Sequence, residues 1–331
     1  MARVDVIIVN YNAGAYLKAC IDGLRAQTLS DFAAVIVDNA SEDGSIEALG
    51  ALDERFQVVR NSDNLGFAVA CNQGAALGQA PWVAMLNPDA IPEPDWLEKL
   101  TQCAEQTGAA AIGSTQIWTG DADILDGAGD VYSPLGVAWR GGFGAPLETA
   151  PPTGTCFGPC AAAALYRRDV FDDIGGFDEN FFCYMEDVDL AFRMRLVGHF
   201  AVQSREAIVH HVGSAIAGRA SPFVIYYGTR NRLWTFLKNA PPLMLWTMFP
   251  LHLLVNVGFY IRSFAHKRQE PTGRAIRDAL GNWPDVMRWR RSVQQRRTVS
   301  SVQVAGAMTW SIAKLLGRKP DVRPLQDQTP K

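Results

Sequence analysis

The chain has 331 residues, of which 48% are hydrophobic and 20% charged, and its formal net charge is −3. This length holds one large α/β domain plus a smaller appendage, and the composition is that of an ordinary soluble enzyme rather than of a disordered or fibrous chain. Residues 262–331 carry 15 Lys and Arg against 5 Asp and Glu, a net charge of +10, so the remainder carries −13. A basic tail on an acidic body indicates a segment that meets an anionic surface, although solvated helical faces would also be basic.

Four short apolar runs predict buried parallel strands separated by helices. Strands are expected at Val4–Val9, Phe32–Val37, Gln57–Arg60 and Trp82–Leu86, and helices at Tyr16–Gln27, after Ser45 and at Phe67–Leu77. The alternation predicts a mostly parallel, doubly wound sheet. Ligands bind beyond the carboxyl ends of such strands, where the polar clusters around Asn10, Asp38 and Asp89 fall, so one site could gather all three clusters.

The middle of the chain is harder to assign. Residues 113–159 are rich in Gly and Pro and are expected to be irregular, as a lid or acceptor loop. Cys160–Tyr166 is expected to begin a strand or a helix. Asp187–Val197 is expected to be a helix with Leu190 and Met194 facing inward and Asp189 paired with Arg193.

The six cysteines are scattered, and the N-terminus runs directly into a predicted strand without the apolar core of a secretory leader. We therefore expect a reduced, cytoplasmic compartment. Cys156 and Cys160 are four residues apart, a poor zinc spacing without a second Cys/His pair nearby, and are interpreted as packing residues.

The character of the sequence changes after about residue 220, so a catalytic domain is expected at 1–220 and a helical, basic region at 221–331. Leu243–Ile261 is mostly apolar, and three residues interrupt it: Pro250, His252 and Asn256. A membrane-spanning helix needs about 20 apolar residues. A hairpin lying in the membrane interface, a buried core helix and a true span all stay open, and the flanking Arg262, Lys267 and Arg268 favour the interface.

Two acidic clusters are candidates for catalysis. Asp89 follows a strand and Pro88, where it is placed to bind a divalent metal that neutralises a leaving diphosphate, but taken alone it also suits a turn. Glu186, Asp187 and Asp189 lie at the start of a helix, where they could serve only as caps. Their aromatic surroundings favour a base in a site that excludes water.

Other polar residues have two interpretations. His211 could join a metal carboxylate as a ligand, although a lone histidine is more often simply hydrogen-bonded. Asp38 and Asn39 suit the edge of a pyrimidine and equally a turn. The sequence has neither a Gly-x-Gly-x-x-Gly after the first strand nor a P-loop, so it lacks the signatures of dinucleotide-binding proteins and NTPases.

With these residues in view, the chain resembles the family 2 glycosyltransferases of the GT-A fold, especially their bacterial rhamnosyltransferase-like branch. The resemblance covers roughly residues 4–240 and rests on motifs in the family's order and spacing. They are Val9-Asn10-Tyr11-Asn12, Val37-Asp38-Asn39-Ala40-Ser41 with Asp43-Gly44-Ser45, Asn64-Leu65-Gly66-Phe67-Ala68 with Asn72, Leu86-Asn87-Pro88-Asp89, Tyr166-Arg167-Arg168, Gly175-Gly176-Phe177-Asp178-Glu179, Glu186-Asp187-x-Asp189-Leu190 and His211-x-Gly213-Ser214. Arg230-Asn231-Arg232 before Lys238-Asn239 is similar to that branch as well.

The resemblance implies a role for each matching residue. Asp89 would bind Mg²⁺ or Mn²⁺, with His211 as a further ligand of the metal or diphosphate and His210 as an alternative register. Asn87 departs from the family's acidic pattern, which puts its direct metal contact in question. Asp187 would be the general base, with Glu186 orienting it or the acceptor. The nucleotide-sugar pocket would comprise Val9, Tyr11, Asn12, Asp38, Asn64, Gly66, Asn72, Asn87 and Asp89.

The activity implied is inverting transfer of a sugar, with dTDP-rhamnose as the preferred donor, to a glycan or polyprenyl-linked glycan in cell-surface polysaccharide synthesis. The enzyme would lie at the inner face of the cytoplasmic membrane, with no nucleic-acid partner expected and a homodimer left open. Two alternatives remain. A sugar-phosphate nucleotidyltransferase would want a glycine-rich loop near the N-terminus, and a non-catalytic membrane-associated scaffold would not need Asp89, Asp187 and His211 together.

Overall fold

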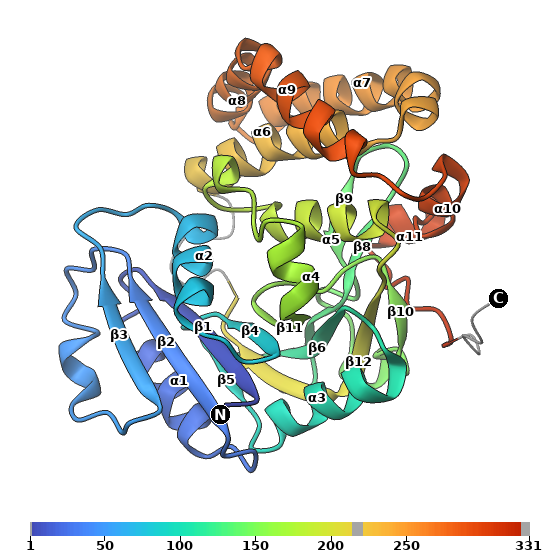
Figure 1. The fold of residues 1–331 in the computed structure, drawn as a ribbon. Coiled ribbons are helices and arrows are strands. Elements are labelled where there is room, and N and C mark those ends of the chain that lie inside the picture. Colours follow the sequence, from blue (N-terminus) through green and yellow to red (C-terminus); the bar gives the residue numbers. More distant parts are fainter. Residues whose placement is uncertain (1, 214–220, 326–331) are drawn as a thin grey trace.

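The computed structural model describes residues 2–213 and 221–325 and is built around a mixed ten-stranded sheet (Figure 1). The four predicted strands are present and form its parallel half, in the order β4-β1-β2-β3. Their bounds are β1 Val4–Asn10, β2 Phe32–Asp38, β3 Phe56–Arg60 and β4 Trp82–Leu86. The register pairs Asn10 with Asp38, so the polar ends of β1 and β2 meet at the same edge, as the sequence predicts.

The other half of the sheet is mostly antiparallel. Its strands are β5 Ala90–Pro92, β6 Ala111–Trp118, β7 Leu125–Ala128, β10 Gly154–Cys156, β11 Ala163–Arg167 and β12 Ala201–His211. β11 lies antiparallel between β4 and β6, while β12 runs parallel to β6 and antiparallel to β5. Strands β8 Asp130–Tyr132 and β9 Ala138–Arg140 form a separate two-stranded ribbon.

Helices cover both faces of the sheet because alternate residues of each strand are apolar on opposite sides. In β1, Val6 and Ile8 join one core with α1 Ala15–Arg25 and α3 Trp96–Thr107. Ile7 and Val9 join the other core, with α2 Phe67–Leu77, α4 Arg168–Asp173 and α5 Glu186–Leu196. Leu190 and Met194 of α5 are buried in this second core, as predicted.

Several predictions of secondary structure were wrong. Residues 113–159 are not an irregular loop, because they contain most of β6 and all of β7, β8, β9 and β10. Their glycines misled the prediction: most lie at the turns between short strands. The helix expected after Ser45 is only the 3-10 turn η1 Glu47–Leu49, which ends at Gly50 with φ +64°. Helix α3 and strand β12 were not predicted.

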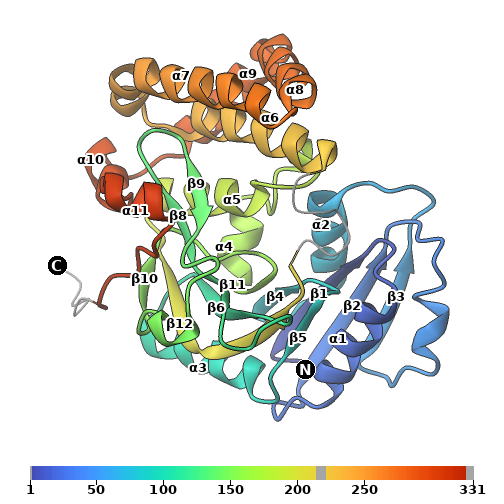
Figure 2. The same ribbon diagram turned by 180° about the vertical axis from the view of Figure 1, so that it is seen from behind.

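The first four C-terminal helices stack above α5, and the last two lie to one side of it (Figures 1 and 2). They are α6 Pro222–Asn239, α7 Pro242–Ala265, α8 Gln269–Gly281, α9 Trp283–Gln295, α10 Ser301–Gly306 and α11 Ile312–Gly317. A third core cluster joins Tyr132 and Phe192 to Trp234 and Phe236, so residues on both sides of the expected 220/221 boundary share one core. Residue 220 itself lies outside the described residues.

Helix α7 exposes apolar side chains on its outer face and directs polar side chains inward. Its outer face exposes a stripe of Leu243, Trp246, Leu254, Ile261 and Phe264, each more than half exposed. The residues that interrupt the apolar run face inward: the ring of His252 stacks on Phe236 with centroids 4.0 Å apart, and Asn256 accepts hydrogen bonds from Arg232. The segment is therefore one continuous helix through Pro250, not a hairpin by itself and not a buried core helix. Among the described helices it alone is long and apolar enough to cross a membrane, which by itself is weak evidence.

A buried ion cluster ties α5 to α6. Asp189 is fully buried and lies 2.8 Å from Arg193 Nε, the predicted pair, and 2.7 Å from Lys238 Nζ. Lys238, only 1% exposed, also lies 2.5 Å from Asp178. Burial opposes ionisation of Asp178, yet the charge of Lys238 lowers the pKa of this carboxyl to about 2.

Removal of this cation should be costly. Lys238→Met keeps most of the apolar stem but leaves Asp178 without its cation and Asp189 with Arg193 alone, so we expect the free energy of unfolding to fall by about 3 kcal/mol. Chemical denaturation measures the loss. Lys18→Met is the control, because Lys18 forms an exposed i,i+4 pair with Asp22 whose loss should cost far less. Equal losses in the two variants would contradict this account.

Candidate active site

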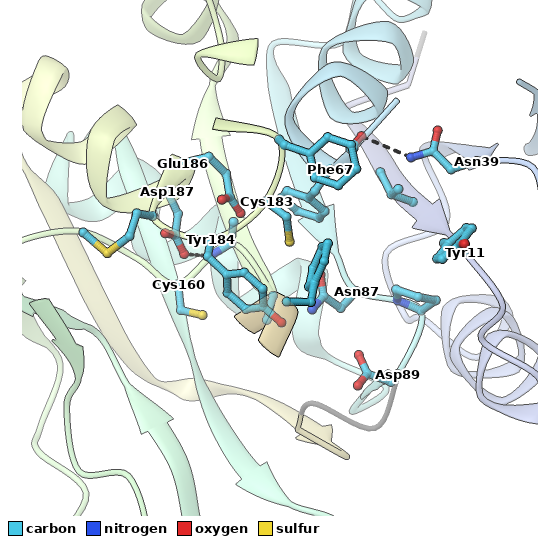
Figure 3. A pocket seen from close by; sticks show the side chains of 18 of the residues that line it. Tyr11, Asn39, Phe67, Asn87, Asp89, Cys160, Cys183, Tyr184, Glu186 and Asp187 are labelled. Carbon is cyan, nitrogen blue, oxygen red and sulfur yellow. Dashed lines mark hydrogen bonds between the residues drawn. The ribbon is translucent and has the colours of Figure 1, made fainter. Parts of the chain in front are cut away.

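A pocket of about 270 Å³ opens at the carboxyl ends of β1 and β4 (Figure 3). Tyr11 and Asn39 lie at one end, Glu186 and Asp187 at the other, and Asn87 and Asp89 between them. Nine predicted site residues line it: Val9, Tyr11, Asn64, Gly66, Asn87, Asp89, Glu186, Asp187 and His211. The pocket thus brings together the acidic clusters that are about 100 residues apart in the sequence.

Three other predicted residues lie beside the pocket without lining it. Asp38 is buried and accepts a hydrogen bond from Asn10 Nδ2 at 2.8 Å. Asn12 is exposed and binds the turn after β2, accepting from Glu42 N and donating its own N–H to Ser41 Oγ. Asn72 exchanges two hydrogen bonds with the backbone of Phe177, so it holds the Gly176–Phe177 turn in place.

Pairing of β5 with β12 brings Asp89 and His211 together. His211 lies opposite Ala90 in this ladder, and Val212 N donates to Asp89 O at 3.0 Å. His211 Nε2 lies 3.3 Å from Asp89 Oδ1. His210 points elsewhere, to Glu93, and does not line the pocket. Ser214, the last residue of this motif, lies outside the described residues.

The donor set at Asp89 and His211 fits a divalent metal. His211 Nδ1 lies 2.7 Å from Asp126 Oδ2, and since a carboxylate accepts, Nδ1 carries the proton. In the neutral imidazole Nε2 then carries the lone pair, and it makes no hydrogen bond of good geometry. Burial opposes protonation of His211, but the carboxylates of Asp126 and Asp89 raise its pKa overall. A carboxylate behind a ligating imidazole is the arrangement that orients histidine towards a metal.

Asp126, Asp130 and Arg140, which were not predicted, extend the site. Arg140 lines the pocket and donates to the same oxygen of Asp126 that His211 contacts. Burial opposes its charge, but the surrounding acidic groups raise the pKa of Arg140. All three residues come from β7, β8 and β9, within the segment expected to be a loop. The signal in the sequence was that Asp126 and Asp130 are charged residues among the apolar and glycine residues from Leu125 to Tyr132.

Three carboxyl groups meet at the other end of the pocket. Burial, and then the charge of Asp187, raise the pKa of Glu186 and Asp130 well above the usual range. Burial also raises the pKa of Asp187, but backbone N–H groups of Ala161 (3.1 Å) and Val188 (2.8 Å) and the charge of Arg140 oppose this rise. Asp187 is therefore the member of the three that is best able to hold a negative charge.

Cys160 also belongs to this end of the pocket. Its sulfur and one oxygen each from Asp130 and Asp187 lie within 4.8 Å of one another. Cys156 and Cys160 are both buried, in agreement with a packing role, but Cys160 lines the pocket as well.

The pocket wall at residues 182–185 is strained and is held by its neighbours. Phe182, Tyr184 and Met185 all have positive φ, between 65° and 70°, which costs each non-glycine residue about 1 kcal/mol or more. Asn231 of α6 compensates, because its Nδ2 lies within 2.9 Å of the carbonyl oxygens of Phe181, Cys183 and Tyr184. From the other side, Phe67 N at the start of α2 donates to Phe182 O at 2.7 Å.

The sheet, its flanking helices and the position of the pocket define a GT-A glycosyltransferase fold. The chain belongs to glycosyl transferase family 2, whose model matches residues 5–175. An N-acetylglucosaminyl-diphospho-decaprenol L-rhamnosyltransferase of Mycobacterium tuberculosis (strain CDC 1551 / Oshkosh) is 28% identical over 245 residues, covering 65% of this chain and 78% of the relative. The predicted resemblance to a rhamnosyltransferase-like branch is thereby confirmed.

Similarity extends to other glycosyltransferases. A glucosyl-dolichyl phosphate glucuronosyltransferase of Haloferax volcanii is 29% identical over 186 residues, which cover 54% of this chain and 56% of the relative. Among solved structures, a mannosyltransferase from Pyrobaculum calidifontis in complex with GDP-Man and Mn²⁺ has a TM-score of 0.54 at 15% identity, with 96% of this chain and 88% of that chain covered. GalNAc-T7 with UDP, GalNAc and Mn²⁺ has a TM-score of 0.58 at 14% identity, covering 72% and 48%.

Gly66 is required where α2 meets the strained wall. Its φ is +88°, and a Cβ added there would lie 2.6 Å from the Phe182 ring and 2.7 Å from its carbonyl oxygen. We expect Gly66→Ala to lower the free energy of unfolding by about 3 kcal/mol, from backbone strain and overpacking together. Gly44→Ala is the matched control, with φ +73° and nothing within 4 Å of the added carbon, and should cost about 1 kcal/mol. Thermal and urea unfolding of both variants would test this, and equal losses would mean that the contact with Phe182 is unimportant.

Proposed function

We propose that this protein is an inverting, metal-dependent hexosyltransferase that moves a sugar from a nucleotide-diphospho sugar to a hydroxyl group of a lipid-linked glycan. The observation that carries the proposal is the arrangement of one pocket: Asp89, with His211 3.3 Å away, lies between Tyr11 and Asn39 at one end and Asp187 at the other. Inversion requires the base and the leaving group on opposite sides of the reacting carbon, and this separation provides for both.

In the proposed reaction, the acceptor oxygen attacks C1 of the sugar, the bond from C1 to the diphosphate oxygen breaks, and the acceptor proton passes to Asp187. Asp187 suits this role because two backbone N–H groups and Arg140 stabilise its charged form. Burial raises the pKa of Glu186 well above the usual range and favours its protonated form, which can donate a hydrogen bond to the acceptor.

Asp89 and His211 would hold Mg²⁺ or Mn²⁺, which would supply positive charge to the departing diphosphate. Asp126 keeps the His211 imidazole in the tautomer that offers Nε2, and Arg140 fixes Asp126 in turn. The nucleotide would lie at the end of the pocket with Val9, Tyr11 and Asn39. Asn87 lines the pocket beside Asp89, but it is an amide and is proposed as a donor-positioning residue rather than a metal ligand.

For the finer identity of the substrates we propose dTDP-rhamnose as donor and a polyprenyl-linked glycan as acceptor. The mycobacterial relative, named for rhamnosyl transfer to a diphospho-decaprenol acceptor, supports both choices. The region 221–331 is proposed as the module that meets the acceptor and the inner face of the cytoplasmic membrane. Its support is the exposed apolar stripe of α7 and the net positive charge of residues 262–331.

Two variants test the roles of the acidic residues against each other. Asp187→Asn should lower transfer by at least about 1,000-fold through loss of the base, while Mn²⁺-dependent binding of the donor nucleotide is kept. Asp89→Ala should abolish the dependence of nucleotide binding on Mn²⁺. Rapid-quench transfer assays and calorimetric titration with and without EDTA measure the two properties. Undiminished transfer in Asp187→Asn, or Mn²⁺-dependent binding retained in Asp89→Ala, would overturn the respective assignment.

The acid limb of the pH profile should respond to the charge of Arg140 and not to the buried acid of Asp130. The base must be ionised to act, so kcat/KM should rise with pH up to the raised pKa of Asp187 and then level off. Arg140→Gln removes a cation and should move this limb to higher pH by about one pH unit, while Asp130→Asn exchanges one neutral group for another and should leave it in place. A limb that stays in place in Arg140→Gln as well would exclude Asp187 as the base.

A further inference from the structure

A second, larger cavity lies directly behind the catalytic pocket. It has a volume of about 870 Å³ and shares Tyr184 and Met185 with the catalytic pocket. Its other walls come from α6, the end of α7, the start of α8, β9 and α11. None of the residues around Tyr11 and Asn39 that line the nucleotide end of the catalytic pocket lines this cavity. It therefore adjoins only the acceptor side of the pocket.

The lining of this cavity is strongly basic. Arg232, Arg262, Arg268 and Arg318 reach it from four different segments of the chain, His266 adds a fifth basic group, and no acidic residue is among the described residues that line it. None of the four arginines forms an ion pair with any residue in 2–213 or 221–325. Arg262, Arg268 and Arg318 are exposed to solvent, and Arg232 is half-buried.

Arg232 is the least exposed of the four arginines, and neutral groups hold its guanidinium in place. Its guanidinium lies 4.6 Å from the Phe259 ring centroid, and its Nε and Nη2 both donate to Asn256 Oδ1, at 3.1 and 2.7 Å. All these partners are neutral. Burial lowers the pKa of Arg232 to about 10, so it remains charged at neutral pH without a compensating anion. An unbalanced charge in such a place costs free energy that an anionic ligand would recover.

The position of the cavity indicates what the anion is attached to. Phe259, Arg262 and Ser263 of α7 line the cavity, while Ile261 and Phe264, between and after them, belong to the exposed apolar stripe. A ligand with an anionic head in the cavity would have its tail beside this stripe. One guanidinium group can donate two parallel hydrogen bonds to the oxygens of a phosphate. Several arginines around one cavity therefore suit a phosphate or diphosphate head better than a single carboxylate.

We propose that this cavity binds the diphosphate of a polyprenyl-linked acceptor, holding the lipid so that its sugar reaches past Tyr184 and Met185 to Asp187. In this assignment, the statement that the sugar reaches Asp187 rests on the proposed glycosyl transfer. The assignment adds a second phosphate-binding site, separate from the donor diphosphate at Asp89 and His211. It also assigns the cavity arginines to acceptor recognition.

Direct binding of farnesyl diphosphate to the full chain tests the site, with EDTA present so that no metal bridges the ligand to Asp89. We expect saturable binding to the wild type by calorimetric titration in detergent. Arg268→Gln/Arg318→Gln should weaken it at least tenfold, because two charge-assisted donors are lost. The matched control is Arg277→Gln/Arg291→Gln, which removes two exposed, unpaired arginines outside the cavity and should change the affinity less than twofold. Arg232 is left intact because it also packs against Phe259 and Asn256.

Two further ligands identify the chemistry. Farnesol should not bind measurably, and inorganic pyrophosphate should bind at least tenfold more weakly than farnesyl diphosphate. If farnesol binds as tightly as farnesyl diphosphate, the cavity is not a phosphate site. Equal losses of farnesyl diphosphate affinity in the two double variants would lead to the same conclusion. Equal affinity for pyrophosphate and farnesyl diphosphate would show a site for a free anion and overturn the lipid assignment.

Donor binding separates this proposal from the proposed function. Arg268→Gln/Arg318→Gln should bind dTDP with Mn²⁺ as the wild type does, because neither arginine lines the catalytic pocket. A matching loss of dTDP affinity would mean that the cavity serves the donor, against the proposal. If the wild type binds none of a panel of nucleotide-diphospho sugars but still binds farnesyl diphosphate through these arginines, the proposed glycosyl transfer fails while the phosphate site stands.

Discussion

A carboxylate with no access to water is the constraint on which this structure depends. Arg193 and Lys238 face the buried carboxylate of Asp189 from two helices, and Asn239 Nδ2 donates to it at 2.7 Å, so its charge is compensated. Arg193 in turn donates to the carbonyl oxygens of Ile174 and Gly176. Since Asp187 lies two residues before Asp189, the same contacts fix the start of α5 and with it the acidic end of the pocket. The packing of the C-terminal helices on α5 is therefore part of how the site is built.

The pocket contains two kinds of electrostatic environment, and Arg140 connects them. At Asp89 and His211, buried oxygen and nitrogen atoms that could bind a metal face the pocket. At Asp130, Glu186 and Asp187, burial raises the pKa of all three carboxyl groups, and backbone N–H groups and Arg140 oppose this rise at Asp187. Arg140 lies between, because it donates to Asp126 on one side and stabilises the charge of Asp187 on the other. One guanidinium thus influences both the orientation of His211 and the basicity of Asp187.

The sequence predicted well wherever a local pattern coincided with the folded environment. The parallel strands and α2 have uniform apolar runs with polar ends, so their bounds agree with the structure to within one residue, and the GT-A family followed from motifs at those ends. The Asp189–Arg193 pair could be predicted because it is local to one helix. Asp126, Asp130 and Arg140 could not, since their roles depend on pairing among short strands that glycine-rich turns separate. For α7 the sequence showed apolar and polar residues, but only packing against α6 determined that the polar ones face inward.

The strained wall of the pocket limits how this part of the site can be exchanged between relatives. The conformation at Phe182, Tyr184 and Met185 does not follow from the loop's own sequence, because Asn231 and Arg230 of α6 hold its carbonyl groups and α2 holds Phe182. In a chimera that receives this loop alone, the loop would lack its contacts with α6 and α2 and would lose its conformation. The smallest segment that can be transplanted as a functional part is the loop together with α6, although about 40 residues separate the two in sequence.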